Sequence, residues 1–428
     1  MTSASRRALG AYYTPEAVVA RGLAALAHPG AGARVVDLAC GDGIWLERAR
    51  ARWPGVQVVG IDVDPETAEA ARSRLGAHAE VRVGDGLATE VLADLVVGNP
   101  PWGLGRAARV RRGQESATRF VARALDLLAP GGRLCLVLPA AWLEVAAHRP
   151  ARERLLAEAA IERVERLGDV FPGVFAPAAL LVARKEPDAA ARDAQWVTTP
   201  VGQVAQAAWA RDPARAFNAR LSAADHALLE RLESGAQRLC GRATFILGVV
   251  TGDNRATLVE TGEGEPIVAG PDVSPFAIRA PSRRLCVPLD DVQQAAPRAA
   301  YARRKVIYRF ISSHPVAAVD EQGLLTLNSA NALAVDDPAL DPYFVAAALN
   351  STAARFAHGA RYALLRILRS HLEQLPLPGG PASEQRAIAR LARREGARAA
   401  AELDDRVLAL YGLSAAERTQ VRDACLRS

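Results

Sequence analysis

The chain has 428 residues, 50% of them hydrophobic, which is enough for two or three domains that each bury a core. No apolar stretch approaches the roughly 20 residues of a membrane span, and the N-terminus lacks the apolar region of a secretion signal. The net charge of +6 is a modest excess. The five cysteines are scattered without CxxC spacing, so we expect no metal site and no disulfide framework, but a reducing, cytoplasmic setting.

The N-terminal part alternates short apolar runs with helical patterns. Helical patterns cover residues 65–75 and 116–132, the second ending at Pro-Gly-Gly. Alternation of this kind predicts an α/β fold with a doubly wound, mostly parallel sheet. Two later runs, 161–168 and 178–185, predict a hairpin at the edge of that sheet. The runs typical of buried strands are 34–39, 56–63, 79–83, 93–98 and 133–139.

The pattern then changes twice. After Glu186 an alanine-rich stretch without clear periodicity predicts a linker, and beyond it short β-like pieces alternate with turn residues. From about Pro381 the sequence is strongly helical. We therefore divide the chain into a first domain at 1–188, a linker at 189–215, an α+β domain at 216–380 and a helical segment at 381–428.

Three acidic residues follow successive predicted strands, at Asp37, Asp62 and Asp85. The first precedes a glycine-containing loop and a helix start, which is where open α/β sheets bind ligands. The second can accept hydrogen bonds from ribose hydroxyls, and the third from an adenine amino group. Dinucleotide-binding folds use similar acids, but "CGDG" lacks their third glycine. Asp42 also stands where a pyrophosphate would approach, so an uncharged or cationic nucleoside fits better.

The fourth strand leads directly into "NPPW", residues 99–102. Amino groups on aromatic rings are poor nucleophiles because the lone pair is delocalised into the ring. A site that methylates such a group must accept hydrogen bonds from both N–H groups. The side-chain amide of Asn99 and the carbonyl of Pro100 can do so from a rigid turn, and Trp102 offers a flat stacking face.

In this order the motifs resemble those of the S-adenosylmethionine-dependent amino methyltransferases, in particular the gamma-class N6-adenine DNA methyltransferases of the TaqI-like branch. "AYYTPEAVV" (11–19) looks like the N-terminal cofactor motif, and "DLACGDG" (37–43) matches the first core motif. The resemblance implies a Rossmann-like class I methyltransferase domain at 1–188 with S-adenosyl-L-methionine as cofactor. The cofactor-binding residues that it implies are Thr14, Asp37, Ala39, Gly41, Asp62, Val63, Asp85, Gly86 and Pro101.

The same resemblance implies that the target base is flipped out of the duplex and attacks the methyl group directly. "LGDVFPGVF" (167–175) resembles the later motif whose phenylalanine stacks on the flipped base. We assign that role to Phe171, with Phe175 as the alternative. The implied catalytic residues are Asn99, Pro100, Pro101, Trp102 and Phe171.

The C-terminal half resembles, more loosely, the target-recognition region of such enzymes and the ending of type IIG restriction–modification proteins. Its expected partner is double-stranded DNA, gripped by clustered cations. No nuclease motif precedes the first motif, so a restriction endonuclease partner would be a separate chain. The residues expected to contact DNA are Arg106, Arg109, Arg111, Arg112, Asn254, Arg255, Arg303, Arg304 and Lys305.

The sequence thus predicts a site-specific adenine N6 DNA methyltransferase of a restriction–modification or related defence system. Two alternatives stay open. Sites with the NPP motif also methylate RNA adenines or protein glutamine, although a peptide substrate needs no large basic region. A non-catalytic DNA-binding specificity subunit is the third reading, against which the intact strand-end acids and NPPW argue.

Overall fold

The computed structural model describes residues 13–102, 116–172, 176–212, 214–362 and 365–427. The chain divides into two compact units, Met1–Ala223 and Ala224–Ser428, which we call the N-terminal and C-terminal units. Among the described residues, no helix is long and apolar enough to cross a bilayer.

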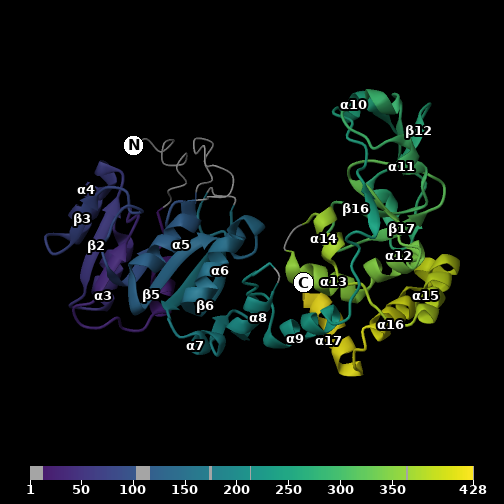
Figure 1. Ribbon diagram of the computed structural model, residues 1–428. Helices are drawn as coiled ribbons and strands as arrows, with labels where there is room; N and C mark the ends of the chain where they lie inside the picture. The colour runs from purple at the N-terminus through teal and green to yellow at the C-terminus, as the bar shows by residue number, and fades with distance from the viewer. Residues whose placement is uncertain (1–12, 103–115, 173–175, 213, 363–364, 428) are drawn as a thin grey trace. The chain divides into compact units, whose positions relative to one another are not determined.

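The described part of the N-terminal unit is built on a nine-stranded sheet of order β3-β2-β1-β4-β5-β7-β6-β8-β9 (Figure 1). Strands β3, β2, β1, β4 and β5 are parallel, which confirms the doubly wound α/β prediction. Strand β7 is antiparallel to both β5 and β6. The strands are β1 (Arg34–Asp37), β2 (Gln57–Asp62), β3 (Glu80–Val83), β4 (Ala93–Gly98), β5 (Leu128–Pro139), β6 (Ala159–Gly168), β7 (Ala178–Lys185), β8 (Trp196–Thr199) and β9 (Gly202–Ala205).

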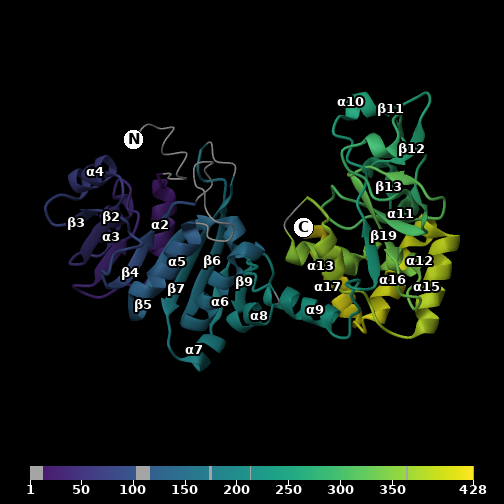
Figure 2. The ribbon, with the colours of Figure 1, turned by 45° about the horizontal axis from the view of Figure 1, so that its top comes forward.

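Helices cover both faces of this sheet (Figures 1 and 2). Residues of α5 and α6 share one apolar core with one face, and residues of α2, α3 and α4 share a second core with the other. Helix α5 ends at Leu127, so the predicted helix at 116–132 is too long, because the chain enters β5 at Leu128. The helices are α2 (Glu16–Ala24), α3 (Ile44–Arg52), α4 (Pro65–Leu75), α5 (Ser116–Leu127), α6 (Arg149–Glu158), α7 (Ala189–Asp193) and α8 (Gln206–Arg211), with 3-10 turns η1 (Ala140–Leu143) and η2 (Ala146–His148).

The stretch at 189–215 is not the linker that its composition suggested. It contains α7, β8, β9 and α8, and β8 pairs in parallel with β6, so the hairpin of β6 and β7 is not at the sheet's edge either. Gln206 holds this stretch to β6: its Oε1 accepts from Ile161 N at 2.7 Å, and its Nε2 donates to Ala159 O at 3.0 Å. Trp209 is fully buried and stacks on Phe217. These isolated anchors bury the stretch despite its weak periodicity.

The C-terminal unit combines small sheets with helices, as the α+β prediction expected. Among its described residues, two four-stranded sheets have the orders β10-β19-β16-β17 and β11-β15-β12-β18, and β13 pairs with β14. Their strands are β10 (Ala243–Ile246), β11 (Leu258–Val259), β12 (Glu265–Val268), β13 (Val273–Ser274), β14 (Ala277–Ile278), β15 (Arg283–Leu285), β16 (Lys305–Arg309), β17 (Ala317–Asp320), β18 (Leu325–Thr326) and β19 (Ala330–Val335).

The helical end of the chain belongs to this same unit. Helix α15 packs on α12, and α17 packs on α13, so residues 381–427 are not a separate segment. The helices are α9 (Ala223–Glu233), α10 (Asn254–Thr257), α11 (Arg298–Ala302), α12 (Pro342–Asn350), α13 (Thr352–Arg361), α14 (Arg369–Gln374), α15 (Ala382–Arg394), α16 (Ala400–Leu410) and α17 (Ala415–Arg427), with 3-10 turns η3 (Gly270–Asp272), η4 (Leu289–Asp291) and η5 (Gly396–Ala399).

Candidate functional site

The carboxyl ends of the parallel strands bring the three predicted acids to one edge of the N-terminal sheet. Asp37 ends β1 and pairs in register with Gly60, two residues before Asp62 ends β2. Asp62 pairs in turn with Val83, the last residue of β3, and Asp85 follows two residues later. The order of acids along the sequence therefore becomes a row along the edge, as predicted. We call this the carboxyl edge.

Asp37 is the most perturbed acid of that row. Its side chain is buried, and its Oδ1 accepts from the backbone N–H of Ala39 at 3.0 Å, whereas its Oδ2 is buried without a hydrogen-bond partner in the part of the chain that the structure describes. Burial, together with the nearby carboxylates of Asp62 and Asp42, raises the pKa of Asp37 from 3.8 to about 8 against the opposing effect of the Ala39 hydrogen bond. A buried carboxyl oxygen without a partner is costly, and a cationic or N–H-bearing ligand group would satisfy it.

Two glycines allow the backbone to pack closely around Asp37. Gly98 has φ of +143°, and a Cβ on it would lie 2.6 Å from Asp37 Oδ1. A Cβ on Gly86 would lie 1.9 Å from the carbonyl oxygen of Leu38. A side chain at either position would therefore clash with this close packing, which we call the cradle around Asp37. Gly86 was among the predicted cofactor residues; Gly98 was missed, although a glycine directly before NPPW was a signal for it.

The other two acids shape their own loops. Asp62 Oδ2 accepts from Gly41 N at 2.9 Å and Oδ1 accepts from Asp64 N at 3.0 Å, so Asp62 ties the glycine loop to β2. Burial raises the pKa of Asp62 as well. Its neighbour Val63 is an exposed apolar side chain, 67% accessible, at the same strand end. Asp85 is exposed and accepts from Leu87 N at 2.9 Å.

The glycine loop is less acidic than its sequence suggested. Arg74 of α4 forms an ion pair with Asp42 at 2.7 Å and a second with Glu47. At the other end of the predicted cofactor site, the hydroxyl of Thr14 accepts from Trp45 Nε1 at 3.3 Å, and both residues are buried. This bond fixes the start of α2 to α3, and so places Thr14 against the same domain core as the loop.

At the end of β4, Asn99 Oδ1 accepts a hydrogen bond from Trp102 Nε1 at 3.0 Å. The tryptophan ring is only 1% exposed and lies in the core shared with α2 and α3. This bond was not anticipated. It orients the Asn99 amide, and an amide oxygen with two lone pairs can still accept a second hydrogen bond.

The predicted stacking of a base between Trp102 and Phe171 does not match this arrangement. The two rings meet edge to face, with centroids 5.2 Å apart and planes at 90°, and Phe171 is 4% exposed. A base between two parallel rings needs about 7 Å between them, two van der Waals contacts. The structure therefore brings the pair together as a packed contact. The alternative residue, Phe175, lies outside the described residues.

Comparisons with known proteins find matches in both parts of the chain. Residues 22–145 match the methyltransferase small domain, and residues 265–377 match the TaqI-like C-terminal specificity domain. The type II methyltransferase M.TthHB8I of Thermus thermophilus is 34% identical over 206 residues, which cover 43% of this chain and 46% of that protein. By these matches, the chain carries a domain of the S-adenosylmethionine-dependent methyltransferase family. Its second half carries a TaqI-like specificity domain.

Two further matches support less about this chain. The ribosomal RNA small subunit methyltransferase C of Pseudomonas aeruginosa is 34% identical over 111 residues, covering 25% of this chain and 32% of that protein. The cryoEM structure of the DrdV–DNA complex has a TM-score of 0.53 at 11% identity, over 91% of this chain and 58% of that one, and shows a shared fold. The chain spans about half or less of the length of these curated relatives.

Several of the predicted DNA contacts have another role in the structure. Lys305 is fully buried, donates to Tyr301 O at 2.5 Å and forms an ion pair with Asp320, so its assignment as a DNA contact is wrong. An ammonium group without solvent access cannot reach a phosphate. The sequence around Lys305 could not show this burial, because Asp320 comes next to Lys305 only when β16 pairs with β17.

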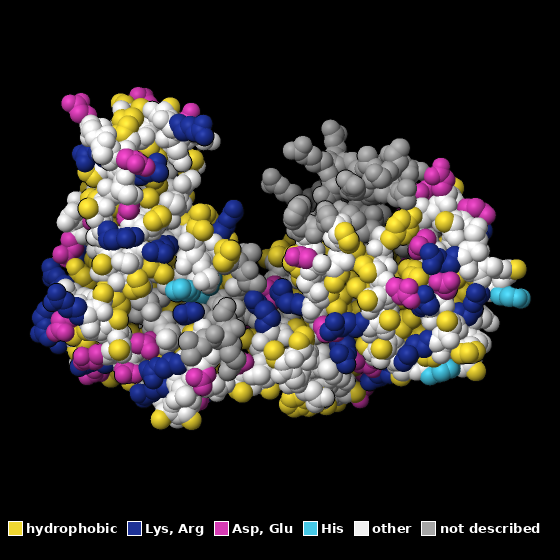
Figure 3. Space-filling model, turned by 180° about the vertical axis from the view of Figure 1, so that it is seen from behind, with side chains coloured by type: hydrophobic (Ala, Val, Ile, Leu, Met, Phe, Trp, Pro, Cys, Tyr) yellow, Lys and Arg dark blue, Asp and Glu magenta, His cyan; other side chains and the backbone are white. Residues whose placement is uncertain are grey.

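The arginines beside Lys305 are also engaged. Arg303 pairs with Asp336 at 2.6 Å, and Arg304 pairs with Glu321 at 3.3 Å. Figure 3 shows this mixture at the surface, with basic and acidic side chains interspersed. Asn254 and Arg255 lie exposed on α10, as a DNA-reading turn requires. The four arginines of the loop after NPPW, Arg106, Arg109, Arg111 and Arg112, lie outside the described residues.

Proposed function

We propose that this protein transfers a methyl group to the N6 atom of adenine in duplex DNA at a specific sequence. The observation that carries the proposal is the position of Asn99 and Pro100. They follow β4 directly, next to the Gly98 backbone that contacts Asp37, in a chain whose other half matches a TaqI-like specificity domain. The type II methyltransferase relative supports a role in restriction and modification.

The residues around Asp37 fit S-adenosylmethionine. Its ammonium group would satisfy the unpartnered Oδ2 of Asp37, and its adenosine would lie along Asp62, Val63 and Asp85 at the neighbouring strand ends. When bound there, the cofactor supplies an electrophilic methyl group.

Asn99 and Pro100 then act on the acceptor amine. The Asn99 Oδ1 and the Pro100 carbonyl accept from the two N–H groups, which turns the nitrogen lone pair out of conjugation and toward the methyl donor. No strong general base is needed, because the amine becomes acidic once it is alkylated and the two oxygens already hold its protons. The turn is fixed before substrate binds, so little reorganisation is needed.

Trp102 serves in this scheme as a positioning residue. By donating to Asn99 Oδ1 at 3.0 Å it fixes the rotamer of the amide and stops the side chain from flipping its N and O ends. The stacking role assigned to Trp102 and Phe171 then requires their edge-to-face contact to open when the base enters. Otherwise another ring, such as that of Phe175, supplies the stacking face.

RNA adenine is the second candidate substrate. The observation that favours it is the match of 111 residues, at 34% identity, to a ribosomal RNA methyltransferase. That match covers 25% of the chain, whereas a TaqI-like specificity domain matches residues 265–377. We therefore rank duplex DNA first.

The test is expression of the full chain in a bacterial host without DNA methylation, followed by sequencing that detects modified bases. We expect N6-methyladenine in one sequence context, which is absent when Asn99→Ala is expressed to the same level. Radiolabel from S-adenosylmethionine that enters RNA or protein, with unmodified DNA, would overturn the proposal.

A further inference from the structure

Two arginines at the carboxyl edge share one carboxylate. Glu144, which follows η1, accepts from Arg166 Nη2 at 2.6 Å, and its Oε1 lies 3.4 Å from Arg220 Nη2. The side chains of Arg166 and Arg220 are 27% and 33% exposed, and that of Glu144 is 12% exposed. Two cations on one anion leave a net positive charge at a site that is partly closed to water.

Three nitrogen atoms of this cluster lack acceptors. Arg166 Nε, Arg220 Nε and Arg220 Nη2 are buried and have no hydrogen-bond partner among the described residues. Burial lowers the pKa of Arg220, and the charge of Arg166 lowers it further against the opposing effect of Glu144. Buried N–H donors without acceptors leave the positive charge of the two guanidinium groups poorly compensated, and an anion bound at their exposed side would offset that charge.

The cluster is assembled from three separate segments. Arg166 lies near the end of β6, and Glu144 follows η1 directly. Arg220 belongs to a segment anchored by the hydrogen bond from Phe217 N to Leu143 O at 2.8 Å and by the contact of Phe217 with Trp142. Arg220 is thus held by the same turn that carries Glu144, which makes the site part of the fold rather than a chance meeting of surface side chains.

The register of the sheet places this cluster level with the NPPW motif. Arg166 pairs with Ala179 of β7, and Ala179 pairs with Leu138 of β5. Leu138 lies two residues beyond Leu136, the partner of Gly98, just as Pro100 lies two residues beyond Gly98. Arg166 is therefore at the height of Pro100, three strand spacings or about 14 Å away.

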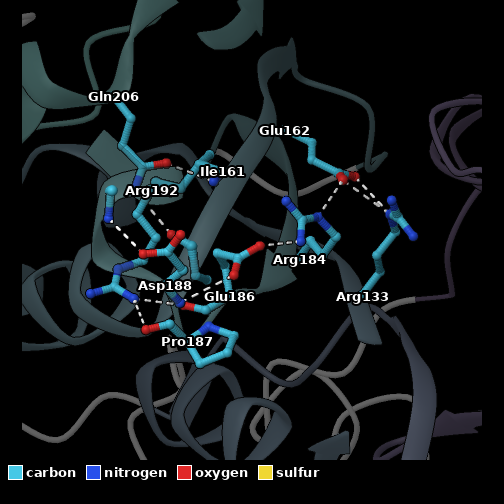
Figure 4. A network of polar contacts seen from close by, with 11 residues as sticks. Arg133, Ile161, Glu162, Arg184, Glu186, Pro187, Asp188, Arg192 and Gln206 are labelled. Carbon is cyan, nitrogen blue, oxygen red and sulfur yellow. Dashed lines mark hydrogen bonds and ion pairs between the residues drawn. The ribbon is translucent and has the colours of Figure 1, made fainter. Parts of the chain in front are cut away.

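The opposite edge of the same sheet shows how this chain pairs arginines for structure (Figure 4). There Arg133 donates to both oxygens of Glu162 at 3.0 Å, and Arg184 lies between Glu162 and Glu186. Two guanidinium groups meet two carboxylates at nearly the same exposure as at the carboxyl edge. We call these four residues the balanced network.

Unpartnered buried nitrogens alone do not mark a site. Arg48 and Arg123 also have such an Nε atom. What distinguishes Arg166 and Arg220 is that both depend on a single carboxylate and stand level with Pro100. Guanidinium groups in this arrangement suit a phosphate, whose several oxygens can accept from both at once.

We propose that Arg166 and Arg220 bind a backbone phosphate of the DNA strand that delivers the target base. The phosphate flanks the extruded nucleotide and accepts from N–H groups on the solvent-exposed part of the two side chains, while Glu144 positions both side chains before DNA arrives. This site contacts no base edge, so it strengthens binding equally for all sequences. The inference rests on the proposed function in that it takes duplex DNA as the substrate.

The experiment measures binding of the full chain to a fluorescein-labelled duplex of arbitrary sequence at several NaCl concentrations. Arg166→Gln and Arg220→Gln should each weaken binding about tenfold at low salt, and should each reduce the slope of log K against log salt by about 0.9. Arg166→Lys should keep most of that slope, because it retains the charge. Arg184→Gln, in the balanced network, is the matched control and should bind as the wild type does.

Glu144→Gln separates a phosphate site from a structural ion pair. If the arginines bind phosphate, removing Glu144 leaves their charges and keeps or tightens DNA binding. If the cluster only stabilises the fold, Glu144→Gln and Arg166→Gln lower the melting temperature together and leave the salt slope unchanged, which overturns the inference. Wild-type protein that binds no duplex DNA, or binds RNA in preference, overturns the proposed function itself; DNA methylation with unaltered binding by the arginine variants overturns this inference alone.

Discussion

The two edges of the N-terminal sheet use the same residue types to different ends. At the balanced network, Arg133, Glu162, Arg184 and Glu186 satisfy one another, and Arg192 donates to the carbonyl of Pro187 nearby (Figure 4). That edge is complete without any other molecule.

At the carboxyl edge, groups remain incomplete. Asp37 Oδ2 has no hydrogen-bond partner among the described residues. Arg166 and Arg220, further along the same edge, share the carboxylate of Glu144. The incomplete groups have opposite charge, in keeping with a cationic cofactor at one and an anionic strand at the other. The difference teaches that the same residue types can satisfy one another at one edge of the sheet and leave charge uncompensated at the other, where a ligand can complete it.

The largest effect is expected at Lys305, whose buried ion pair with Asp320 leaves neither charge without a partner. It is fully buried against Asp320, so Lys305→Ala leaves an uncompensated buried carboxylate and should destabilise the C-terminal unit by about 3–5 kcal/mol. Chemical denaturation monitored by circular dichroism measures this. Arg303→Ala, an exposed pair with Asp336, is the control and should cost less than about 1 kcal/mol. Equal effects for the two variants would show that Lys305 is not a buried structural cation.

Asn99→Ala tests whether the incomplete edge performs chemistry. Loss of the acceptor should lower the methylation rate about 10²–10³-fold, because the amine lone pair is no longer turned toward the donor. Binding of S-adenosylmethionine, measured by calorimetry, should stay within about twofold of the wild type. Trp102→Phe removes the hydrogen bond to Asn99, along with part of the buried ring, but keeps Asn99 itself and should give a smaller loss. A rate for Asn99→Ala close to that of the wild type would contradict the proposed role.

Gly98→Ala tests the cradle around Asp37. Its Cβ would lie 2.6 Å from Asp37 Oδ1, and its φ of +143° is strained for other residues, so we expect a loss of about 3 kcal/mol in stability and weak cofactor binding. Gly131 also has positive φ, +80°, but open space around it. Gly131→Ala should therefore cost only about 1 kcal/mol and leave cofactor binding intact. Similar cofactor affinities for the two variants would show that the close packing of Gly98 against Asp37 is not needed for cofactor binding.

The pH dependence of cofactor binding tests Asp37. Because its folded pKa is raised to about 8, the unliganded carboxyl is protonated at neutral pH, and a cationic ligand binds its ionised form. Affinity should rise toward tenfold per pH unit below about 8 and level off above it. In Asp37→Asn it should be weak and flat.

The same shift predicts the stability of the unliganded protein. A folded pKa above the unfolded value means that the folded state binds the additional proton, so this contribution is present at low pH and is lost as pH rises from about 4 to about 8. Asp37→Asn should remove that loss, measured as the change in melting temperature between pH 6 and 8. A wild-type affinity independent of pH would contradict both expectations.

The position of the site was predictable from the sequence because it depends on local patterns. Each acid follows its own apolar run, and parallel strands bring their carboxyl ends to one edge without further information, so Asp37, Asp62 and Asp85 were placed correctly along it. The linker was misplaced for the converse reason. Its alanine-rich periodicity is weak, and what holds it is a few side chains such as Gln206 and Trp209 that reach distant strands.

The sequence by itself determined the alternation of strands and helices, the edge where the acids and NPPW meet, and the motif order that identifies the family. All of these follow from periodicity and from neighbours in the chain. Only the tertiary structure decided that Lys305 is buried against Asp320, that Trp102 orients Asn99 while packing edge-on against Phe171, and that Arg166 and Arg220 share Glu144. Charge and exposure depend on which segments the fold brings together, and residue type alone does not encode them.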